Sequence, residues 1–393
     1  MNPPAAPPAD LDEFRAAARA WLAGADVPDP PEDYDERFAA LRDWQRTLYE
    51  AGWIGFGWPE EFGGRGLTAA HQIVFSEELA RARAPQPVGL IGLDVVGPTI
   101  LGHGSDEQRR RLLPPLLSGE ELWSQGFSEP SAGSDLASLR TKGVVEGDEI
   151  VITGQKVWTS WAEESDWCAV LARTDPDAPN HKGISYVLVP MDSPGIEVRP
   201  IVQMTGDAEF NEVFFDGVRV PVGNLLGGFG AGWKLAMDTL GHERGRYALR
   251  RRMENETSFV DLVAGLREHA AATGGNAVAD RAAVQLGELY AELRAYECQA
   301  RATVERIVAG DVPSPLDSID KLTLSVTEQH LYALAVELLG PARMAADATA
   351  NGLPAGHWLR GHLYARSGSV YGGSAQIQRS IVAERMLDLP RSR

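Results

Sequence analysis

Two short segments in the middle third of the chain combine small hydroxyl groups, glycine backbone and one large aromatic side chain. Residues 124–135 read SQGFSEPSAGSD, and residues 154–160 read GQKVWTS. A flat ring with polar atoms around its edge needs backbone N–H groups and hydroxyls beside that edge and an aromatic wall against one side. Each segment alone is equally consistent with an ordinary β-rich surface, in which Trp158 is a core residue and the serines lie in turns. Both segments supply the mixture of groups that such a ring needs.

Two changes of hydrophobic period indicate the elements that must position these segments. Apolar residues follow helical spacing over residues 10–122, with one predicted helix that starts at Tyr34 and ends before Gly52. Over residues 123–220, short β-branched and aromatic runs alternate with turn residues, and no helical segment separates them. Strands without crossover helices pair antiparallel, so we expect an antiparallel sheet or barrel there. Helical patterns then return towards the end of the chain.

Local signals predict where several elements begin or turn. Ser105 with Gln108 is typical of a capping box at the start of a helix, and Gly147 of the turn in a hairpin over residues 144–152. Another helix is expected to begin near Thr68. The predicted helices of the last third span 232–252, a segment to about 272, 279–309, 318–339 and 375–387. We therefore predict an N-terminal helical domain over 1–122, a middle β domain over 123–222 and a C-terminal helical bundle over 223–393.

Composition disfavours several classes of protein. The 393 residues carry a formal charge of -18 with 44% hydrophobic residues, which suits a large core and disfavours binding to nucleic acid or an anionic membrane. The first residues lack the pattern of a leader peptide, and no apolar run reaches about 18 residues, so we expect the cytoplasm. The two cysteines, Cys168 and Cys298, are too few for a disulfide framework or a zinc cluster, and both are expected to be buried and unreactive.

Two further patterns point only weakly to other chemistry. Residues 227–232 read GGFGAG between a strand and a helix, but a dinucleotide site needs a βαβ unit, and helices follow here. A glycine-rich entry to a helix is the favoured interpretation. His242 and Glu243 do not complete a zinc-binding HExxH motif, because Arg246 stands in place of the second histidine, and no metal site is expected.

The two segments resemble the flavin-edge motifs of the acyl-CoA dehydrogenases. The resemblance covers most of the chain, from residues 51–53 (AGW) to residues 371–379 (YGGSAQIQR), with the motifs in the same order. It implies the family's α+β multidomain fold, with an N-terminal α-helical domain, a middle antiparallel β-barrel domain and a C-terminal four-helix bundle. It also implies FAD as the cofactor and an acyl-CoA, or another acyl thioester, as the substrate.

The resemblance implies flavin contacts residue by residue. The matching positions are Gln125, Phe127, Ser128, Gly133, Ser134, Trp158, Thr159, Ser160, Ser374 and Gln376. The first three would face the pyrimidine side of the ring, and Gly133 and Ser134 would lie near the phosphates and the CoA arm of the substrate. Trp158 would wall off the dimethylbenzene side, the two hydroxyls after it would reach N5 and O4, and Ser374 and Gln376 would lie at the adenine. A dry wall of this kind keeps a reduced flavin from losing electrons to oxygen.

The position of the catalytic base distinguishes branches of the family. Removing an α-proton from an acyl thioester while a hydride leaves the β-carbon requires a carboxylate on the side opposite the flavin. Many members carry it in a Tyr-Glu-Gly-Thr motif of the substrate pocket, where this chain has Tyr371 and Gly372. A branch with isovaleryl, long-chain and steroid side-chain enzymes instead carries a Glu-Arg pair on the first bundle helix, which matches Glu243 and Arg244. The resemblance therefore implies Glu243 as the base, with Arg244 at the CoA arm or in a structural pair; the alternative for Glu243 is a helix-surface carboxylate paired with an arginine.

Some features that the family uses between subunits are missing. Residues 266–276 lack the usual Phe-Gly, and Glu337 replaces a glutamine ahead of Gly340. A carboxylate near a pyrophosphate is unfavourable unless neutralised, so a partner would supply the missing contacts. The helices also carry more leucines than one face needs. These are Leu286, Leu289, Leu322, Leu324, Leu331, Leu334, Leu338 and Leu339. We expect a dimer, a homotetramer or a heteromer with a related subunit, and an electron-transferring flavoprotein as the electron acceptor.

Two rival functions share this fold. In a flavin oxidase or monooxygenase, oxygen reaches the reduced ring, so turnover would consume oxygen. A non-catalytic partner subunit of a heteromeric dehydrogenase would be colourless when purified alone.

Overall fold

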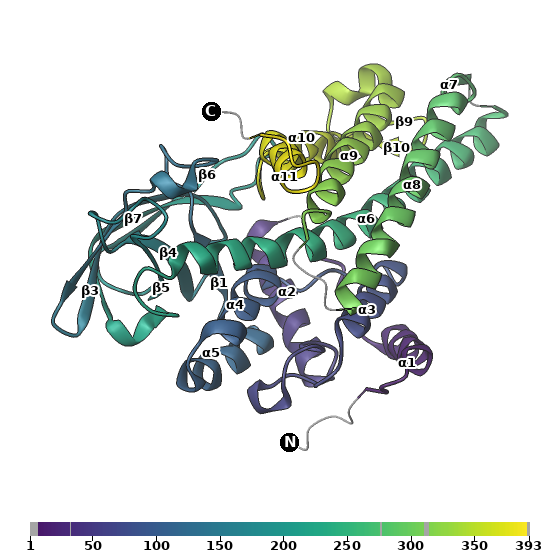
Figure 1. Cartoon of the computed structure of the whole chain (residues 1–393). Helices are drawn as coiled ribbons and strands as arrows, with labels where there is room; N and C mark the ends of the chain where they lie inside the picture. The colour runs from purple at the N-terminus through teal and green to yellow at the C-terminus, as the bar shows by residue number, and fades with distance from the viewer. Residues whose placement is uncertain (1–6, 32, 276, 310–313, 391–393) are drawn as a thin grey trace. The chain divides into compact units, whose positions relative to one another are not determined.

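The computed structural model describes residues 7–31, 33–275, 277–309 and 314–390, without the side chains of residues 242–249, 279, 307 and 308. The chain, drawn in Figure 1 with its helices and strands labelled, divides into two compact units, Met1–Glu243 and Arg244–Arg393. Each unit has its own hydrophobic core. The first unit contains the N-terminal helices, the main sheet and the beginning of the helix Gly232–Thr273, and the second contains the rest of that helix and the helices after it. The finer division into three domains after residues 122 and 222 stays a sequence-based prediction.

Three of the N-terminal helices begin where the sequence indicates, at Tyr34, after Thr68 and after Ser105. These helices are α1 (Leu11–Gly24), α2 (Tyr34–Glu50), α3 (Ala69–Arg81), α4 (Gly97–His103) and α5 (Asp106–Ser118). At the start of α5, the backbone N–H of Gln108 donates to Ser105 Oγ at 3.1 Å, and the backbone N–H of Ser105 donates to Gln108 Oε1 at 2.9 Å. The predicted capping box is therefore confirmed, since each residue satisfies a free helix-end group of the other.

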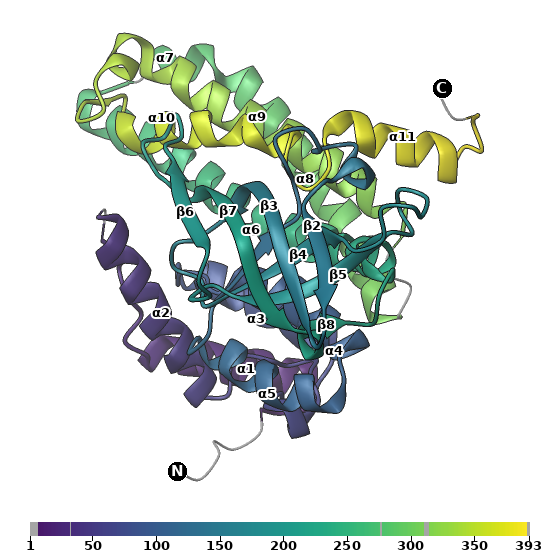
Figure 2. The same ribbon diagram turned by 90° about the vertical axis from the view of Figure 1, so that its left-hand side faces the viewer.

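A mixed sheet follows these helices. Its strands are β1 (Trp123–Gly126), β2 (Lys142–Glu146), β3 (Glu149–Ser160), β4 (Trp167–Arg173), β5 (Ile184–Pro190), β6 (Ile196–Ile201), β7 (Phe210–Pro221) and β8 (Leu225–Leu226). They run in the order β6-β7-β3-β2-β4-β5-β8 (Figure 2). Strand β1 pairs with β4. The predicted hairpin is confirmed as β2 and β3, with Gly147 at φ 67° in its turn.

Pairing in the sheet is antiparallel for most neighbours, as expected, with a local exception at β4. Strand β1 runs parallel to β4, and β2 meets β4 in parallel at one residue pair. A parallel pair needs a long connection, and the β2–β3 hairpin supplies it here in place of a helix. Sequence patterning alone gives no sign of this arrangement, because the pairing joins residues about 44 positions apart, as in Trp123 with Trp167.

Strands β4 and β5 are buried on both faces. Leu171 and Tyr186 belong to the core that the N-terminal helices share, whereas Val170 and Val187 belong to a second cluster among the strands. Such strands have apolar residues on both faces instead of alternating with polar ones. The sheet is thereby held rigidly against the helices of the same unit.

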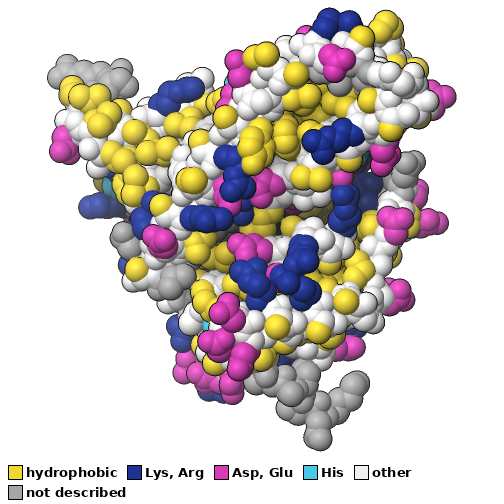
Figure 3. Space-filling view, turned by 90° about the vertical axis from the view of Figure 1, so that its right-hand side faces the viewer, with side chains coloured by type: hydrophobic (Ala, Val, Ile, Leu, Met, Phe, Trp, Pro, Cys, Tyr) yellow, Lys and Arg dark blue, Asp and Glu magenta, His cyan; other side chains and the backbone are white. Residues whose placement is uncertain are grey.

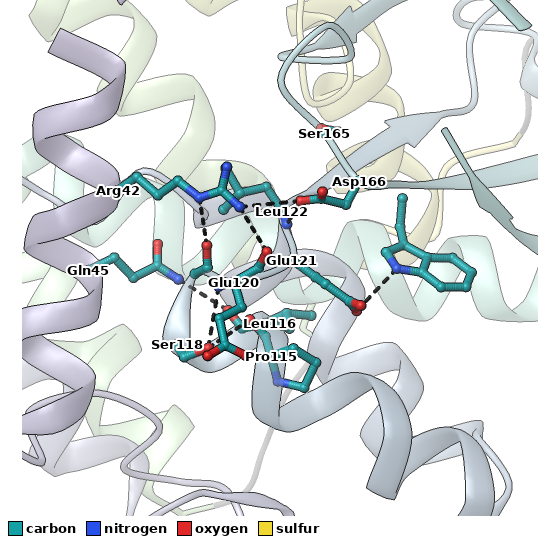
Figure 4. A network of polar contacts seen from close by, with 12 residues as sticks. Arg42, Gln45, Pro115, Leu116, Ser118, Glu120, Glu121, Leu122, Ser165 and Asp166 are labelled. Atoms are coloured by element: carbon teal, nitrogen blue, oxygen red, sulfur yellow. Dashed lines mark hydrogen bonds and ion pairs between the residues drawn. The ribbon is translucent and has the colours of Figure 1, made fainter. Parts of the chain in front are cut away.

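A polar network sets the point at which the helices give way to the sheet (Figure 4). Arg42 of α2 donates to the carbonyl oxygens of Gly119 and Glu120 at 2.9 and 2.8 Å, just after α5 ends. The Asp166 carboxylate lies 3.7 Å from the Arg42 guanidinium and accepts from the backbone N–H of Leu122 at 2.8 Å. Strand β1 begins at the next residue, so this network fixes the start of the first motif segment.

The C-terminal helices differ from the prediction in three places, one of which is that the predicted helix 279–309 is divided into two helices. They are α6 (Gly232–Thr273), α7 (Ala277–Arg281), α8 (Ala283–Val308), α9 (Asp317–Leu339), α10 (Ala355–Ala365) and α11 (Ala375–Arg385), with a short hairpin of β9 (Thr349–Ala350) and β10 (Leu353–Pro354) before α10. Helix α6 is one helix of 42 residues where two segments were expected, because no proline interrupts it. Helix α10 was not predicted.

The leucines of α8 and α9 mostly fill the core of the second unit. Leu289, Leu331 and Leu338 are at most 4% exposed and pack in one cluster. These leucines therefore need no partner to cover them.

On the outer side of α8, Cys298 is exposed, so the prediction that both cysteines are buried is wrong for Cys298 and confirmed for Cys168.

Of the helices that the structure describes, none combines the length and the apolar character of a membrane span.

Candidate functional site

The first motif segment runs from β1 into a loop at the end of the strand. Phe127 is buried, with its ring edge-on to Tyr186 at 5.7 Å between centroids. Gln125 and Ser128 are half-buried, whereas Gly133 and Ser134 lie exposed in the loop beyond. The segment therefore offers anchored apolar and polar groups first and accessible backbone further on.

The second motif segment presents a tryptophan from an irregular part of β3. The pairing of β3 with β7 shifts between Lys156 and Thr159, and Trp158 between them has a left-handed φ of 60°. A left-handed backbone is uncommon for a bulky residue and is kept where the surroundings enforce it. The Trp158 side chain is 59% exposed, with one ring contact to Phe210 at 6.1 Å. Trp158 is thus not the core residue of the alternative interpretation.

A direct hydrogen bond holds the two segments side by side. The backbone N–H of Val157 donates to the carbonyl of Ser128 at 3.0 Å. The sequence predicts both segments at one pocket, and the structure brings together Gln125, Phe127 and Ser128 with the strand that carries Trp158, Thr159 and Ser160.

Polar atoms without partners lie beside this junction. Among the described residues, Gln125 Nε2 and Thr159 Oγ1 are buried atoms that have no hydrogen-bond partner. Nearly all buried polar side-chain atoms in proteins have a partner, so unpaired ones mark a place where a ligand or water belongs. One of these atoms belongs to each motif segment, and each can take a polar group of a ligand as its partner.

A buried ion pair between Glu129 and Lys156 also joins the two segments, and sequence reasoning did not single it out. Lys156 Nζ is 2.8 Å from Glu129 Oε1, and Lys156 is fully buried. Burial lowers the pKa of Lys156 to about 8, against the opposing effect of the Glu129 charge. Burial alone would raise the pKa of the Glu129 carboxyl, but Lys156 and the hydrogen bonds to it bring that pKa below its usual value. The first motif carries two acidic residues, Glu129 and Asp135, and the second carries one basic residue, Lys156, and these charges of opposite sign were the signal available in the sequence.

The predicted base and its neighbour lie outside the described side chains. Glu243 and Arg244 fall within the backbone of α6, at the boundary between the two compact units. Their roles stay predictions.

The remaining predicted residues lie in the second unit, around the start of α11. Tyr371 is half-buried, with Lys321 Nζ 4.0 Å from its ring centroid. Gly372 has a left-handed φ of 61°, which favours glycine over any residue with a side chain. Ser374 caps α11, since the backbone N–H of Ile377 donates to its Oγ at 3.4 Å, and Gln376 is exposed. The backbone turn at position 372 therefore favours glycine, which agrees with the absence of a carboxylate at this position.

The glycine-rich residues 227–232 lead from β8 into α6. The backbone N–H of Gly230 donates to Ser185 Oγ at 3.1 Å, and a side chain at Gly232 would collide with the backbone of Ser185. Helices follow in the described chain, with no βαβ unit, as the helix-entry interpretation predicts.

Comparison with known proteins assigns the chain to a family. The models of the acyl-CoA dehydrogenase N-terminal, middle and C-terminal domains match residues 8–120, 124–218 and 230–387. The chain belongs to the acyl-CoA dehydrogenase family, and its predicted fold class and enzyme class are confirmed.

Individual relatives are similar to this chain over nearly its whole length. The acyl-CoA dehydrogenase IpdE1 of Mycobacterium tuberculosis is 43% identical over 396 residues, which cover 97% of this chain and 98% of that protein. Among solved structures, the Tcur3481-Tcur3483 steroid ACAD has a TM-score of 0.83 at 31% identity, with 98% of this chain and 99% of that chain covered. The ChsE4-ChsE5 complex of Mycobacterium tuberculosis has a TM-score of 0.81 at 32% identity, with 97% and 98% covered.

Proposed function

We propose that this chain catalyses the FAD-dependent α,β-desaturation of an acyl-CoA, with Glu243 as the base that removes the α-proton. One observation carries the proposal. The two motif segments are joined by the hydrogen bond from Val157 N to Ser128 O, and the Trp158 ring stands exposed directly beside that bond. This is the arrangement that a flavin ring needs, with polar groups at its edge and an aromatic wall.

The residues present fit FAD. The unpaired Gln125 and Thr159 side-chain atoms supply polar partners, and Ser128 and Ser160 add half-buried hydroxyls. Gly133 and Ser134 offer exposed backbone for the phosphates or the CoA arm, and Ser374 and Gln376 are proposed for the adenine side. Bound there, FAD would supply the acceptor for the β-hydride of the substrate.

The acid–base chemistry falls to the chain's own residues. The Glu243 carboxylate takes the α-proton, as general-base catalysis requires of a group within hydrogen-bond reach of that proton. Gly372 carries no carboxylate, so it does not compete for the role, and Tyr371 and Gly372 would border the substrate. Arg244 would hold the CoA arm.

The substrate and the partners are proposed from the relatives. Because a similar solved structure is named a steroid ACAD, we propose an acyl-CoA with a steroid-derived acyl group. Because another is named as a complex of two different chains, a heteromer is proposed beside a homo-oligomer. An electron-transferring flavoprotein is proposed as the electron acceptor, as the resemblance to the family implies.

The visible spectrum of the purified protein tests this proposal. We expect flavin absorption, release of free FAD by acid or heat, and anaerobic bleaching by steroid acyl-CoA thioesters within a panel that includes short and straight-chain ones. Rapid oxygen consumption on turnover would favour the oxidase alternative. A protein that stays colourless after soaking with FAD, alone and with its natural partners, would contradict the proposal.

A further inference from the structure

The buried pair of Glu129 and Lys156 is costly as a purely structural device. Both side chains are at most 5% exposed. Taking two charges out of water costs several kcal/mol per ion, and such pairs often stabilise a fold no better than apolar residues do. A further reason for the pair is therefore expected.

The Glu129 carboxylate closes the loop that carries Gly133 and Ser134. Its Oε2 accepts the backbone N–H of Arg140 at 2.7 Å, and its Oε1 accepts that of Thr141 at 2.8 Å. A loop whose far end is tied to the carboxylate at its near end has little freedom to shift. The exposed residues of this loop are thereby presented in one position.

A cation from the sheet secures the same far end. Arg173 of β4 donates to the carbonyl oxygens of Ala137 and Leu139 at 2.8 and 3.1 Å. The backbone N–H of Arg173 also donates to Thr141 O at 2.7 Å. The loop is therefore tied to the rigid strand β4 as well as to Glu129.

Lys156 ties the near end to the strand with the exposed tryptophan. Its Nζ donates to the Phe127 carbonyl at 3.1 Å as well as to Glu129 Oε1 at 2.8 Å. Trp158 is two residues further along β3. A displacement of Lys156 would consequently move the backbone on both sides of the junction.

We propose that Glu129 is the positioning residue of the flavin site. Through Lys156 and two backbone N–H groups it holds three stretches in one arrangement, namely residues 127–128, the loop of Gly133 and Ser134, and residues 158–160. This inference rests on the proposed function, because it concerns the binding of FAD. Glu129 itself acts from behind the pocket.

Substitution of each partner tests the proposal, with FAD itself as the probe. In Glu129→Gln, the amide cannot accept from both backbone N–H groups and pair with a cation as a carboxylate does. We expect the FAD dissociation constant to rise by about ten-fold or more, by analogy with the hydrogen-bond partners that orient metal ligands. We also expect a changed visible circular dichroism of the bound flavin. The double variant Glu129→Gln/Lys156→Met removes both buried charges and should regain stability of the apoprotein without regaining FAD affinity.

The matched control is Arg219→Met. Arg219 forms ion pairs with Glu146 and Glu149 on the same sheet, but it is 50% exposed. FAD affinity should stay at the wild-type value in this variant.

Each result of these substitutions supports or overturns the positioning role of Glu129. Folded variants that bind FAD with wild-type affinity and spectrum would show that the pair supports the fold alone, and would overturn the inference. If Glu129→Gln fails to fold, the FAD affinity and visible spectrum of the double variant test the inference instead. Loss of folding in both variants would also overturn the inference. A wild-type protein that does not bind FAD would overturn the proposed function instead, which separates the two failures.

Discussion

At the scale of single residues, Trp158 shows how backbone geometry prepares a binding surface. Its left-handed φ of 60° and the shifted pairing around it turn the ring out of the sheet. An exposed large aromatic ring on a rigid strand loses little conformational freedom when it contacts a ligand. This residue was expected at the flavin from its motif, whereas its exposure follows from a local irregularity that no periodicity predicts.

Replacing this ring separates its binding role from a role in folding. In Trp158→Ala, the exposed ring is lost, so the free energy of unfolding of the apoprotein should change by about 0.5 kcal/mol or less. FAD affinity should fall, and the reduced flavin should react faster with oxygen, because the wall against solvent is gone. The change should be smaller in Trp158→Phe. Stopped-flow reoxidation and thermal unfolding measure the two effects, with Phe229→Ala, also an exposed aromatic at 50%, as the control. An unchanged reoxidation rate in Trp158→Ala would contradict the proposal that the Trp158 ring shields the flavin from solvent.

At the scale of elements, a carboxylate of α3 holds α1 in place. Glu78 is buried and receives hydrogen bonds from Arg19 at 2.8 and 2.9 Å and from Arg15 at 3.1 Å. The neighbouring Glu77 pairs with Arg15 at 2.7 Å but is 36% exposed. The two glutamates thus differ in burial while they share a helix and a partner.

This difference predicts unequal effects on stability. Glu78→Gln should lower the free energy of unfolding by about 1–3 kcal/mol, because it weakens charge-assisted hydrogen bonds at a buried site. Glu77→Gln should cost about 0.5 kcal/mol or less, as exposed pairs do. Denaturant unfolding compares them, and equal effects would contradict the account.

The pH dependence of Glu78→Gln follows from the same contacts. The hydrogen bond from Arg19 chiefly, and Arg15 with it, hold the pKa of the Glu78 carboxyl below its usual 4.5, against the raising effect of burial. The folded protein then holds this proton less tightly than the unfolded chain, so the contribution is complete above pH 4.5 and is lost as the pH falls through the folded pKa. The gap between wild type and Glu78→Gln should accordingly shrink below pH 4.5.

Elements with local signals could be predicted from the sequence, and those with distant causes could not. The capping box at Ser105 and the turn at Gly147 depend on neighbouring residues, and both were predicted correctly. The parallel pairing of β1 with β4 and the ion pair of Glu129 with Lys156 join residues far apart in the sequence. Their partners are chosen by the fold as a whole, which a single sequence does not show.

At the scale of the whole molecule, the net charge of -18 is not spread as a uniform acidic coat. The face in Figure 3 carries both signs of charge among exposed hydrophobic side chains. In the second unit, Tyr290 of α8 and Val326 of α9 are 54% and 47% exposed. Since the core leucines are covered within the chain, these outer residues are the better candidates for contact with another subunit.

The central claim is most directly tested by rapid anaerobic mixing of wild type and Glu243→Gln with a steroid acyl-CoA. The amide keeps the shape of the side chain but cannot take the α-proton, so flavin bleaching should slow by roughly 100-fold or more while FAD stays bound. Glu268→Gln, an exposed carboxylate further along α6, should bleach at the wild-type rate. Near-normal bleaching by Glu243→Gln would contradict the account and assign the base to another carboxylate.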